Sequence, residues 1–521
     1  MRRYAETITN VLIFLFIVGV SLKRNLLIRS TMDIALTDES RYLKEALKFN
    51  ASHVLPPLKG FLYTLWCAGT SRFFQDMLSF HYWNYRLLAV LAALNFYYLL
   101  RGIRVQRFVA LAVTFLYVFM DCGRGASFTF VNFFAVLILL VFLNIAIRLK
   151  NKENVVFVMA LGALAASFVR PEYLLSFYFI LGYLAIKFLL FHRTDREMRK
   201  KLLGLGLVFA AVISTLGNPS LSKKSEWMIF GNNFSIAAVK RYHDPIIHPV
   251  LEWRRVTETK FPKANSIVSA AISNPREFKA HIFYNVKNYF RCLRFGFGVW
   301  WIEAGFFLVA GLGLMRFLKG TGSSSYNREW VFVATALLFS PVLSVIVLSV
   351  IGRYLTLQTL CLFALFGVGI NKMFKVEFHG VLIVILGVAV LIAMPTDGGD
   401  FYSKNPRNLS RTKMIFYLRS LRTSEEPRLL CDSVFPASPL GIYVNRPVTL
   451  INPYAKRESF LEFLEKKKIN LIMISYAGWS FVNNHLYVED KEFKDFIAAP
   501  ENYGFAKSFS NAHHIFTKRG V

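Results

Sequence analysis

The chain has 521 residues, of which 55% are hydrophobic and only 18% are charged. A soluble globular protein usually has about a quarter of its residues charged, so this composition argues against a large soluble protein and favours a polytopic membrane protein. The formal net charge is +30, but Lys and Arg fall in short clusters between apolar runs, which is typical of membrane loops. We therefore expect membrane lipids, and no nucleic acid, among its partners.

Apolar runs that are long enough, or nearly long enough, to cross a bilayer recur about eleven times. These runs are residues 8–22, 84–100, 108–121, 127–147, 154–169, 171–191, 202–217, 297–317, 330–351, 354–371 and 379–395. The first run follows a basic start, as in a signal peptide, but no small-x-small cleavage site closes it. We predict that it is an uncleaved first span.

The connections between alternate runs are basic: RGIRVQR, RLKNKEN, HRTDREMRKK, RFLKGTGSSSYNRE and NKMFKVE. Because basic loops stay on the cytoplasmic side, this pattern predicts a cytoplasmic N-terminus and an extracytoplasmic C-terminus. The same alternation leaves residues 23–83, residues 218–296 and the tail outside. We expect a membrane domain over residues 1–395 and a second domain over residues 396–521.

The tail has a different pattern from the membrane runs. RLLCDSV, GIYVNRPVTLI, ESFLEFLEKKK, INLIMISYA and HHIFTKR predict the order strand, strand, helix, strand, strand. This order predicts a small α/β domain on the extracytoplasmic side. Tyr443 within it either contacts a glycan or packs in the small core, and we favour packing.

The first outer segment contains TDESRYLKEALKFNASHVLPPLKGFLYTLW. Thr37 is suited to cap a helix whose first turn holds Asp38 and Glu39, where carboxylates favour the positive end of the helix dipole. Apolar residues gather on one side of this helix, so it suits the headgroup plane; the proline pair ends it and a second short apolar helix follows. The acidic pair either stabilises the start of the helix and has no catalytic role, or it contains a catalytic group.

No metal or cofactor is expected, since the five cysteines are scattered without a CxxC pattern. The segment RYHDPIIHP contains His243 and His248, but their spacing matches no standard zinc site. We interpret this segment as loop structure or as a contact to an acceptor, with metal binding the less favoured alternative.

TDESRYLKEA followed by PPLKGFLYTL resembles the first outer loop of GT-C glycosyltransferases, in particular lipid A aminoarabinose transferases and protein O-mannosyltransferases. RPEYLL, NPREFKAHIFYNVKNYF and RYLTLQTLCLFALFG resemble further segments of that family, in the same order. The expected C-terminal α/β domain fits as well. One position departs from the family, because Leu55 precedes the proline pair where many members have Lys.

The resemblance implies an integral membrane enzyme, expected in a bacterial inner membrane with its active site on the extracytoplasmic side. Such an enzyme transfers a sugar, with inversion and without a metal, from a polyprenyl-phosphate donor to a glycan, lipid or protein acceptor. Asp38 matches the position of the family's general base, and Glu39 would bind the acceptor or raise the pKa of its neighbour by like charge.

A departing lipid phosphate requires cationic groups on the same side of the membrane. The candidates for binding the donor phosphate are Arg353, Arg170, Lys59, His53 and Arg124. The candidates for binding the acceptor are Tyr42, His243 and His248. For the arginines, anchoring of a helix end at the bilayer surface is the alternative interpretation.

Two other classes of protein stay open. A transporter or flippase of lipid-linked sugars would place charged residues inside its spans, whereas these runs contain almost none; Glu303, near one end of a run, is the clearest exception. A structural subunit of an envelope complex is the other alternative. The concentration of ionisable groups outside the runs favours the glycosyltransferase.

Overall fold

The fold is given by a computed structural model that describes most of the chain. The described residues are 2–24, 38–57, 60–119, 130–149, 152–191, 195–217, 226–242, 253–293, 300–320, 325–348, 355–373, 410–421, 428–431, 443–444, 449–451, 459–475, 491–510 and 513–519. The chain divides into two compact units. The first contains Met1–Arg24, Pro56–Tyr63 and Arg86–Met394, and the second contains Asn25–Leu55, Thr64–Tyr85 and Pro395–Val521.

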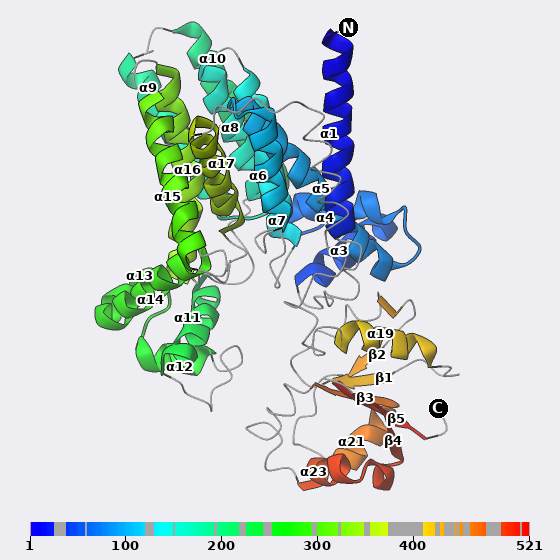
Figure 1. The fold of residues 1–521 in the computed structure, drawn as a ribbon. Helices are drawn as coiled ribbons and strands as arrows, with labels where there is room; N and C mark the ends of the chain where they lie inside the picture. Colours follow the sequence, from blue (N-terminus) through cyan, green and yellow to red (C-terminus); the bar gives the residue numbers. More distant parts are fainter. Residues whose placement is uncertain are drawn as a thin grey trace. The chain divides into compact units, whose positions relative to one another are not determined.

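The first unit is helical (Figure 1). Its helices are α1 (Arg2–Arg24), α6 (Arg107–Phe119), α7 (Phe130–Arg148), α8 (Lys152–Ser167), α9 (Tyr173–Phe191), α10 (Arg196–Leu216), α11 (Glu226–Tyr242), α12 (Trp253–Lys260), α13 (Ile267–Ser273), α14 (Pro275–Leu293), α15 (Trp300–Gly320), α16 (Ser325–Leu348) and α17 (Thr356–Met373). Two more, α4 (Phe61–Ser71) and α5 (Met77–Gly102), contribute to both units. Every predicted apolar run up to residue 371 overlaps one of these helices, and run 379–395 lies outside the described residues.

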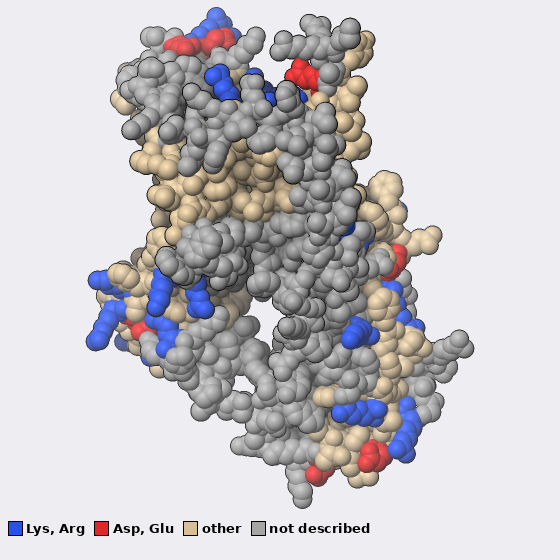
Figure 2. Space-filling view, in the orientation of Figure 1, with Lys and Arg blue, Asp and Glu red and all other residues tan. Residues whose placement is uncertain are grey.

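Three helical segments in the described part of the chain are long and apolar enough to cross a membrane: Glu6–Lys23, Phe130–Arg148 and Tyr173–Leu190. Shorter apolar helical segments are Arg107–Val118, Asn154–Ser167, Glu303–Met315, Phe332–Leu348 and Thr356–Asn371. On the face seen in Figure 2, Lys and Arg side chains gather at the two ends of the helical unit. The protein is therefore helical with apolar helices suited to a membrane, and the number of eleven spans stays a prediction.

Helices α15 and α17 approach each other at two glycines. A Cβ atom added to Gly313 of α15 would overlap the carbonyl oxygen of Leu365 on α17. A Cβ atom added to Gly369 of α17 would likewise overlap the carbonyl oxygen of Val309 on α15. Glycine is required at both positions because backbone atoms of the neighbouring helix occupy the space of a side chain.

The second unit contains α3 (Asp38–Ser52), α19 (Ser410–Ser420) and a five-stranded sheet. The strands are β1 (Arg428–Cys431), β2 (Thr449–Ile451), β3 (Leu471–Ser475), β4 (Phe505–Ser510) and β5 (His513–Lys518), in the spatial order β2-β1-β3-β5-β4. Strand β1 pairs parallel with β2 and β3, whereas β5 pairs antiparallel with β3 and β4. The mixed sheet carries α21 (Phe460–Lys466), α23 (Lys491–Ala498) and the 3₁₀ helix η4 (Pro500–Tyr503).

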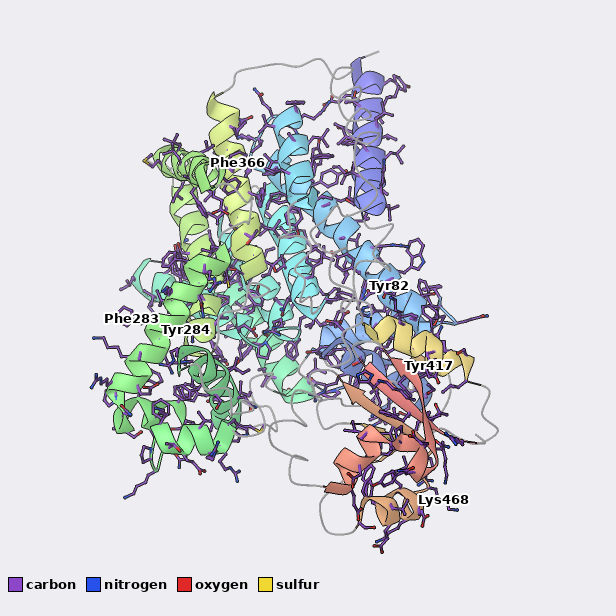
Figure 3. All side chains as sticks on the ribbon, turned by 60° about the horizontal axis from the view of Figure 1, so that its bottom comes forward. Tyr82, Phe283, Tyr284, Phe366, Tyr417 and Lys468 are labelled. Atoms are coloured by element: carbon purple, nitrogen blue, oxygen red, sulfur yellow. The ribbon has the colours of Figure 1, made fainter. Side chains whose placement is uncertain are left out.

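Helices lie on both faces of this sheet. One face forms a core with α21 and α23, in which Phe460 and Phe496 pack against Ile472 and Phe516. Strand residues alternate between faces, so Thr517 points the other way, where its Oγ1 lies 3.4 Å from the hydroxyl oxygen of Tyr417 on α19 (Figure 3).

The elements of the tail agree in part with the sequence. The predicted segments RLLCDSV, ESFLEFLEKKK, INLIMISYA and HHIFTKR coincide with β1, α21, β3 and β5. Of GIYVNRPVTLI, the structure describes the short strand β2 at its end and residues 443–444, and α23 and β4 were not predicted. Whether this sheet forms an extracytoplasmic domain with a boundary at residue 395 stays a prediction.

The first outer segment forms the two helices that its sequence predicts, α3 and α4. The apolar side of α3 is buried, with Leu43 3% and Ala46 0% exposed, while Lys44 is exposed. The helix ends at Ser52, before the proline pair, and the next residue, His53, has a left-handed φ of 54°. Asn50 of α3 donates a hydrogen bond of 2.9 Å to the carbonyl oxygen of Ala68 on α4. The two helices are thus packed together rather than being two independent surface helices.

Candidate functional site

The structure describes some of the predicted site residues and not others. The side chains of Asp38, Lys59, Arg124, His243, His248 and Arg353 lie outside the described part. Of the remaining candidates, Glu39 is buried, Tyr42 and Arg170 are half-buried, and His53 is exposed. Asp38 is the first residue of α3, so its predicted position in the first turn of a helix is correct. Glu39 and His53 belong to the second unit, and Arg170 belongs to the first.

Glu39 is the buried neighbour of Asp38. It is 4% exposed, and the following residue, Ser40, is 0% exposed. Tyr443 of the same unit is also fully buried. Burial, and then the negative charge of Glu39, raise the pKa of the Tyr443 phenol well above its usual value. Glu39 is therefore closed off from solvent within the second unit.

The imidazole ring of His81 packs against the ring of Tyr443. Its ring lies edge-on to the Tyr443 ring, with 6.0 Å between the centroids and an angle of 89° between the planes. Burial lowers the pKa of His81 to about 3, so the imidazole is neutral at neutral pH. His81 therefore contributes an uncharged aromatic wall and no cation to this part of the unit.

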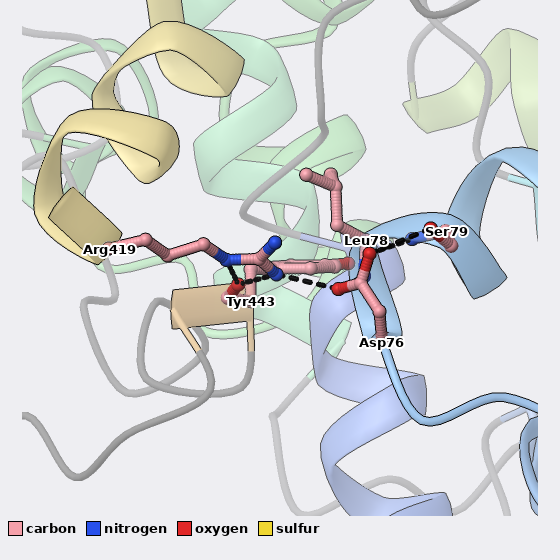
Figure 4. A network of polar contacts seen from close by, with 5 residues as sticks. All are labelled: Asp76, Leu78, Ser79, Arg419 and Tyr443. Atoms are coloured by element: carbon pink, nitrogen blue, oxygen red, sulfur yellow. Dashed lines mark hydrogen bonds and ion pairs between the residues drawn. The ribbon is translucent and has the colours of Figure 1, made fainter.

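Arg419 joins the segment of Tyr443 to the start of α5 (Figure 4). Its Nε donates to the carbonyl oxygen of Tyr443 at 2.9 Å, and its Nη2 donates to the same oxygen and, at 2.6 Å, to Oδ1 of Asp76. Asp76 also accepts hydrogen bonds from the backbone N–H of Leu78 (3.1 Å) and from the hydroxyl of Ser79 (2.7 Å). This network ties the first turn of α5 to α19 and to Tyr443, whose phenol is affected by the charge of Glu39.

The ionised form of Asp76 is favoured. Burial acts to raise the pKa of this carboxyl, but the hydrogen bonds from Ser79, Arg419 and Leu78 outweigh it and hold the pKa below its usual value. Our sequence reasoning missed this network. Asp76 directly precedes α5 and was detectable as a helix cap, whereas nothing local marks Arg419, which lies 343 residues away along the chain.

Arg170 lies in the turn between α8 and α9 and forms an ion pair with Glu172. Its Nε donates to Oε1 of Glu172 at 2.9 Å, and its Nη2 donates to the same oxygen. The two side chains are 15% and 17% exposed. Because the pair carries no net charge, an incoming phosphate would bind Arg170 in exchange for Glu172.

A small recess opens beside this ion pair. It is lined by Asn132, Val136, Arg170, Glu172, Tyr173, Pro341, Val345 and Thr356. Asn132, in the first turn of α7, is 6% exposed, and neither its amide nitrogen nor its oxygen has a hydrogen-bond partner within the described residues. An unsatisfied buried amide costs about 1–3 kcal/mol, so a polar group or a water molecule at this position would be favoured.

The two sets of residues therefore differ in chemistry. One contains a buried carboxylate and neutral aromatic groups next to the first turn of α3, and the other contains a guanidinium in a polar recess. Over the residues that are described, no group of three or more His, Cys, Asp or Glu side chains is arranged to hold a metal ion.

Comparison with known proteins adds no relative: no protein-family model matches the chain, and no curated protein matches it. The resemblance to GT-C glycosyltransferases accordingly depends on the short motifs quoted above and on their order.

Proposed function

We propose that the protein is an integral membrane glycosyltransferase of the GT-C type. It transfers a sugar from a polyprenyl-phosphate donor to a glycan, lipid or protein acceptor, on the extracytoplasmic side of a bacterial inner membrane. The observation that carries this proposal is the acidic start of α3, where Asp38 opens the helix and the next two residues, Glu39 and Ser40, are buried. A carboxylate at the end of an anchored helix has the fixed position that a general base needs.

The proposed architecture has about eleven spans, a cytoplasmic N-terminus and the five-stranded sheet in an extracytoplasmic domain. The helices that overlap the apolar runs and the basic connections between them support it. The sheet contributes no reacting group in this proposal.

In the reaction, Asp38 removes the proton of the acceptor as the acceptor's nucleophilic atom attacks the anomeric carbon. The bond from this carbon to the phosphate oxygen breaks on the opposite face, so the configuration inverts. Polyprenyl phosphate leaves with an additional negative charge. The proton ends on the Asp38 carboxylate and is passed to water.

Cationic side chains offset the charge of the leaving phosphate. We assign this role to Arg170, with Lys59, His53, Arg124 and Arg353 as further candidates. The position of Arg170 supports this assignment, because its planar guanidinium lies in a recess with polar side chains. A phosphate could take the place of Glu172 as its ion-pair partner. Tyr42, His243 and His248 are proposed to contact the acceptor.

The test is sugar transfer by purified protein supplied with a polyprenyl-phosphate sugar. We expect Asp38→Asn to lower kcat by about 10²–10⁴-fold, since it removes the base. The matched control is Glu45→Gln, which neutralises a carboxylate of the same helix that is half-buried and lies two turns further on. Thermal unfolding in detergent must be unchanged in both variants for the comparison to count.

Undiminished transfer by folded Asp38→Asn would remove this residue from the mechanism. If the wild-type protein instead moves a labelled lipid-linked sugar across a vesicle membrane without transferring it, the protein is a transporter of lipid-linked sugars and the proposal is wrong.

A further inference from the structure

Helix α14 has a continuous exposed stripe of basic and aromatic residues. At intervals of three and four residues, the solvent-facing positions are Arg276, Lys279, Ala280, Phe283, Lys287, Phe290 and Arg291. Phe283 and Phe290 are each 64% exposed. Residues at this spacing share one side of a helix, so the stripe combines four cations with two large apolar rings.

The only acidic residue of α14, Glu277, is turned away from this stripe. Its carboxylate pairs at 2.8 Å with Arg241 of α11, and the two side chains are 15% and 12% exposed. The exposed surface of α14 therefore has no negative group to balance Lys279 and Lys287. Within the stripe, the Lys279 ammonium lies over the Phe283 ring, 5.9 Å from its centroid. Figure 3 labels Phe283 on α14.

The opposite side of α14 is anchored to the end of α16. The imidazole Nε2 of His281 lies 3.1 Å from the carbonyl oxygen of Val347. The Asn285 amide donates to the carbonyl oxygen of Ile346 at 2.7 Å. These carbonyls belong to the last turn of a helix, where no intrahelical N–H satisfies them. Two polar side chains thus fix the rotation of α14 about its axis, and with it the direction of the exposed stripe.

These hydrogen bonds also fix the position of α14 along the length of the apolar helix α16. The shorter apolar segment Phe332–Leu348 ends at the turn that α14 holds. Figure 1 shows α11–α14 grouped at this end of α15 and α16. The end of an apolar helix lies at the level of lipid headgroups, where rings enter the acyl boundary and lysine side chains reach the phosphates.

The neighbouring helix α13 adds apolar side chains to the same group of helices. Val268 is 69% exposed and Ile272 is 74% exposed. Figure 2 shows Lys and Arg side chains over the region of α12–α14. Covering rings and aliphatic side chains of this size is favourable, and a bilayer surface covers them whereas water does not.

We propose that the stripe of α14 docks on an anionic bilayer surface, with Phe283 and Phe290 in the acyl boundary and the lysines on lipid phosphates. A neutral bilayer satisfies only the two rings, whereas a soluble acidic glycan pairs with the cations but offers no acyl region for the rings and for Val268 and Ile272. The combination of both along one stripe selects the anionic lipid. The proposal depends on membrane insertion of the protein and is independent of its enzymatic activity.

The test uses full-length protein in nanodiscs of phosphatidylcholine alone or mixed with phosphatidylglycerol. The photoreactive residue p-benzoylphenylalanine replaces Phe283, and mass spectrometry measures the lipid that becomes attached. The matched control carries the same residue at Phe278, which lies on the packed side of α14, 6.0 Å from the Phe230 ring. We expect Phe283 to capture phosphatidylglycerol preferentially and Phe278 to capture little lipid.

Charge is tested in the same experiment with Lys279→Gln and Lys287→Gln. Each change is expected to lower capture of phosphatidylglycerol about fivefold, as high salt should also do. Lys200→Gln on α10 makes the same change of charge at an exposed position outside the stripe and should have no effect.

Equal lipid capture at Phe283 and Phe278 would overturn the proposal. Lipid capture at Phe283 that is the same for neutral and anionic lipid would also overturn the proposal, since the cations would then have no role. Cross-linking of Phe283 to a co-purified protein or to an added acidic polysaccharide would replace the bilayer with that partner.

Discussion

Helix α3 buries an apolar stripe, whereas α14 buries polar side chains and exposes aromatic ones. Leu43 of α3 is 3% exposed, and the basic residues Arg41, Lys44 and Lys48 of that helix are exposed. In α14, His281 and Asn285 are 0% and 1% exposed, while Phe283 is 64% exposed. An amphipathic sequence therefore does not by itself identify the surface that the apolar side meets. In α3 that surface is the protein, and in α14 we infer that it is a bilayer.

The largest effect should come from truncating one apolar side chain in each helix. Leu43→Ala is expected to lower the free energy of unfolding by about 2–5 kcal/mol, because it leaves a cavity. Phe283→Ala removes an exposed side chain and should change it by less than about 0.5 kcal/mol in detergent. Chemical denaturation followed by intrinsic fluorescence measures both. Equal losses would abolish the contrast between the two helices.

Acid should loosen α14 through His281. Burial lowers the pKa of this imidazole to about 4, against the opposing effect of its hydrogen bond to the Val347 carbonyl. The unfolded chain, with a pKa of about 6.5, then binds a proton that the folded chain rejects. Stability is therefore complete above about pH 6.5 and falls by up to about 1.4 kcal/mol per pH unit towards pH 4.

Amide hydrogen exchange of α14 measured against pH checks this prediction. His281→Gln should flatten the pH dependence of α14 protection and leave that of α3 unchanged. If α14 of the wild-type protein is equally protected at pH 7 and pH 4.5, His281 is not held neutral by its surroundings.

The polar anchor of α14 gives the next effect. Asn285→Ala leaves the Ile346 carbonyl without its side-chain donor and should cost about 2 kcal/mol of unfolding free energy. Asn288→Ala, a half-buried position of the same helix, is the control and should cost less than about 0.5 kcal/mol. A thermal melt in detergent that ranks the two variants in the reverse order would show that α14 is held by its apolar contacts.

The smallest effect concerns the unit that contains α3. Arg419→Gln removes the ion pair with Asp76, whose side chain is 32% exposed, so solvent screening limits the loss to about 1 kcal/mol. Arg428→Gln is the matched control, because the Nε of Arg428 donates in the same way to a carbonyl oxygen, that of Lys467, at 2.8 Å. Only Arg419→Gln should increase amide exchange at the start of α5. The same result for both variants would mean that the network in Figure 4 has no particular role.

The sequence predicted the helices of the first unit well, because their apolar runs are long and local. It also predicted the amphipathic character of α3. It did not predict which side of α14 is covered, since that depends on carbonyl groups at the end of α16, more than 60 residues away along the chain. The sequence pattern of α14 contains the same rings and lysines whether the partner is protein or lipid.

The candidate site was predictable only at the level of residue type. Asp38 and Glu39 stand out as an acidic pair, yet nothing local indicates that Glu39 is buried beside Tyr443, because the two are brought together only by folding. Glu172 was visible two residues after Arg170 and was overlooked, although such a pair decides how much charge the arginine offers a phosphate. Burial and pairing of charges are long-range properties that a local motif does not encode.

The close approach of α15 and α17 limits how a lipid-linked molecule could enter the helical unit. At Gly313 and Gly369 the backbones of the two helices touch, so no acyl or prenyl chain fits between them at that level. A side chain at either glycine would collide with a carbonyl oxygen of the other helix. If the proposed lipid-linked donor enters this unit from the bilayer, its hydrocarbon tail passes between other helices than α15 and α17 at this level.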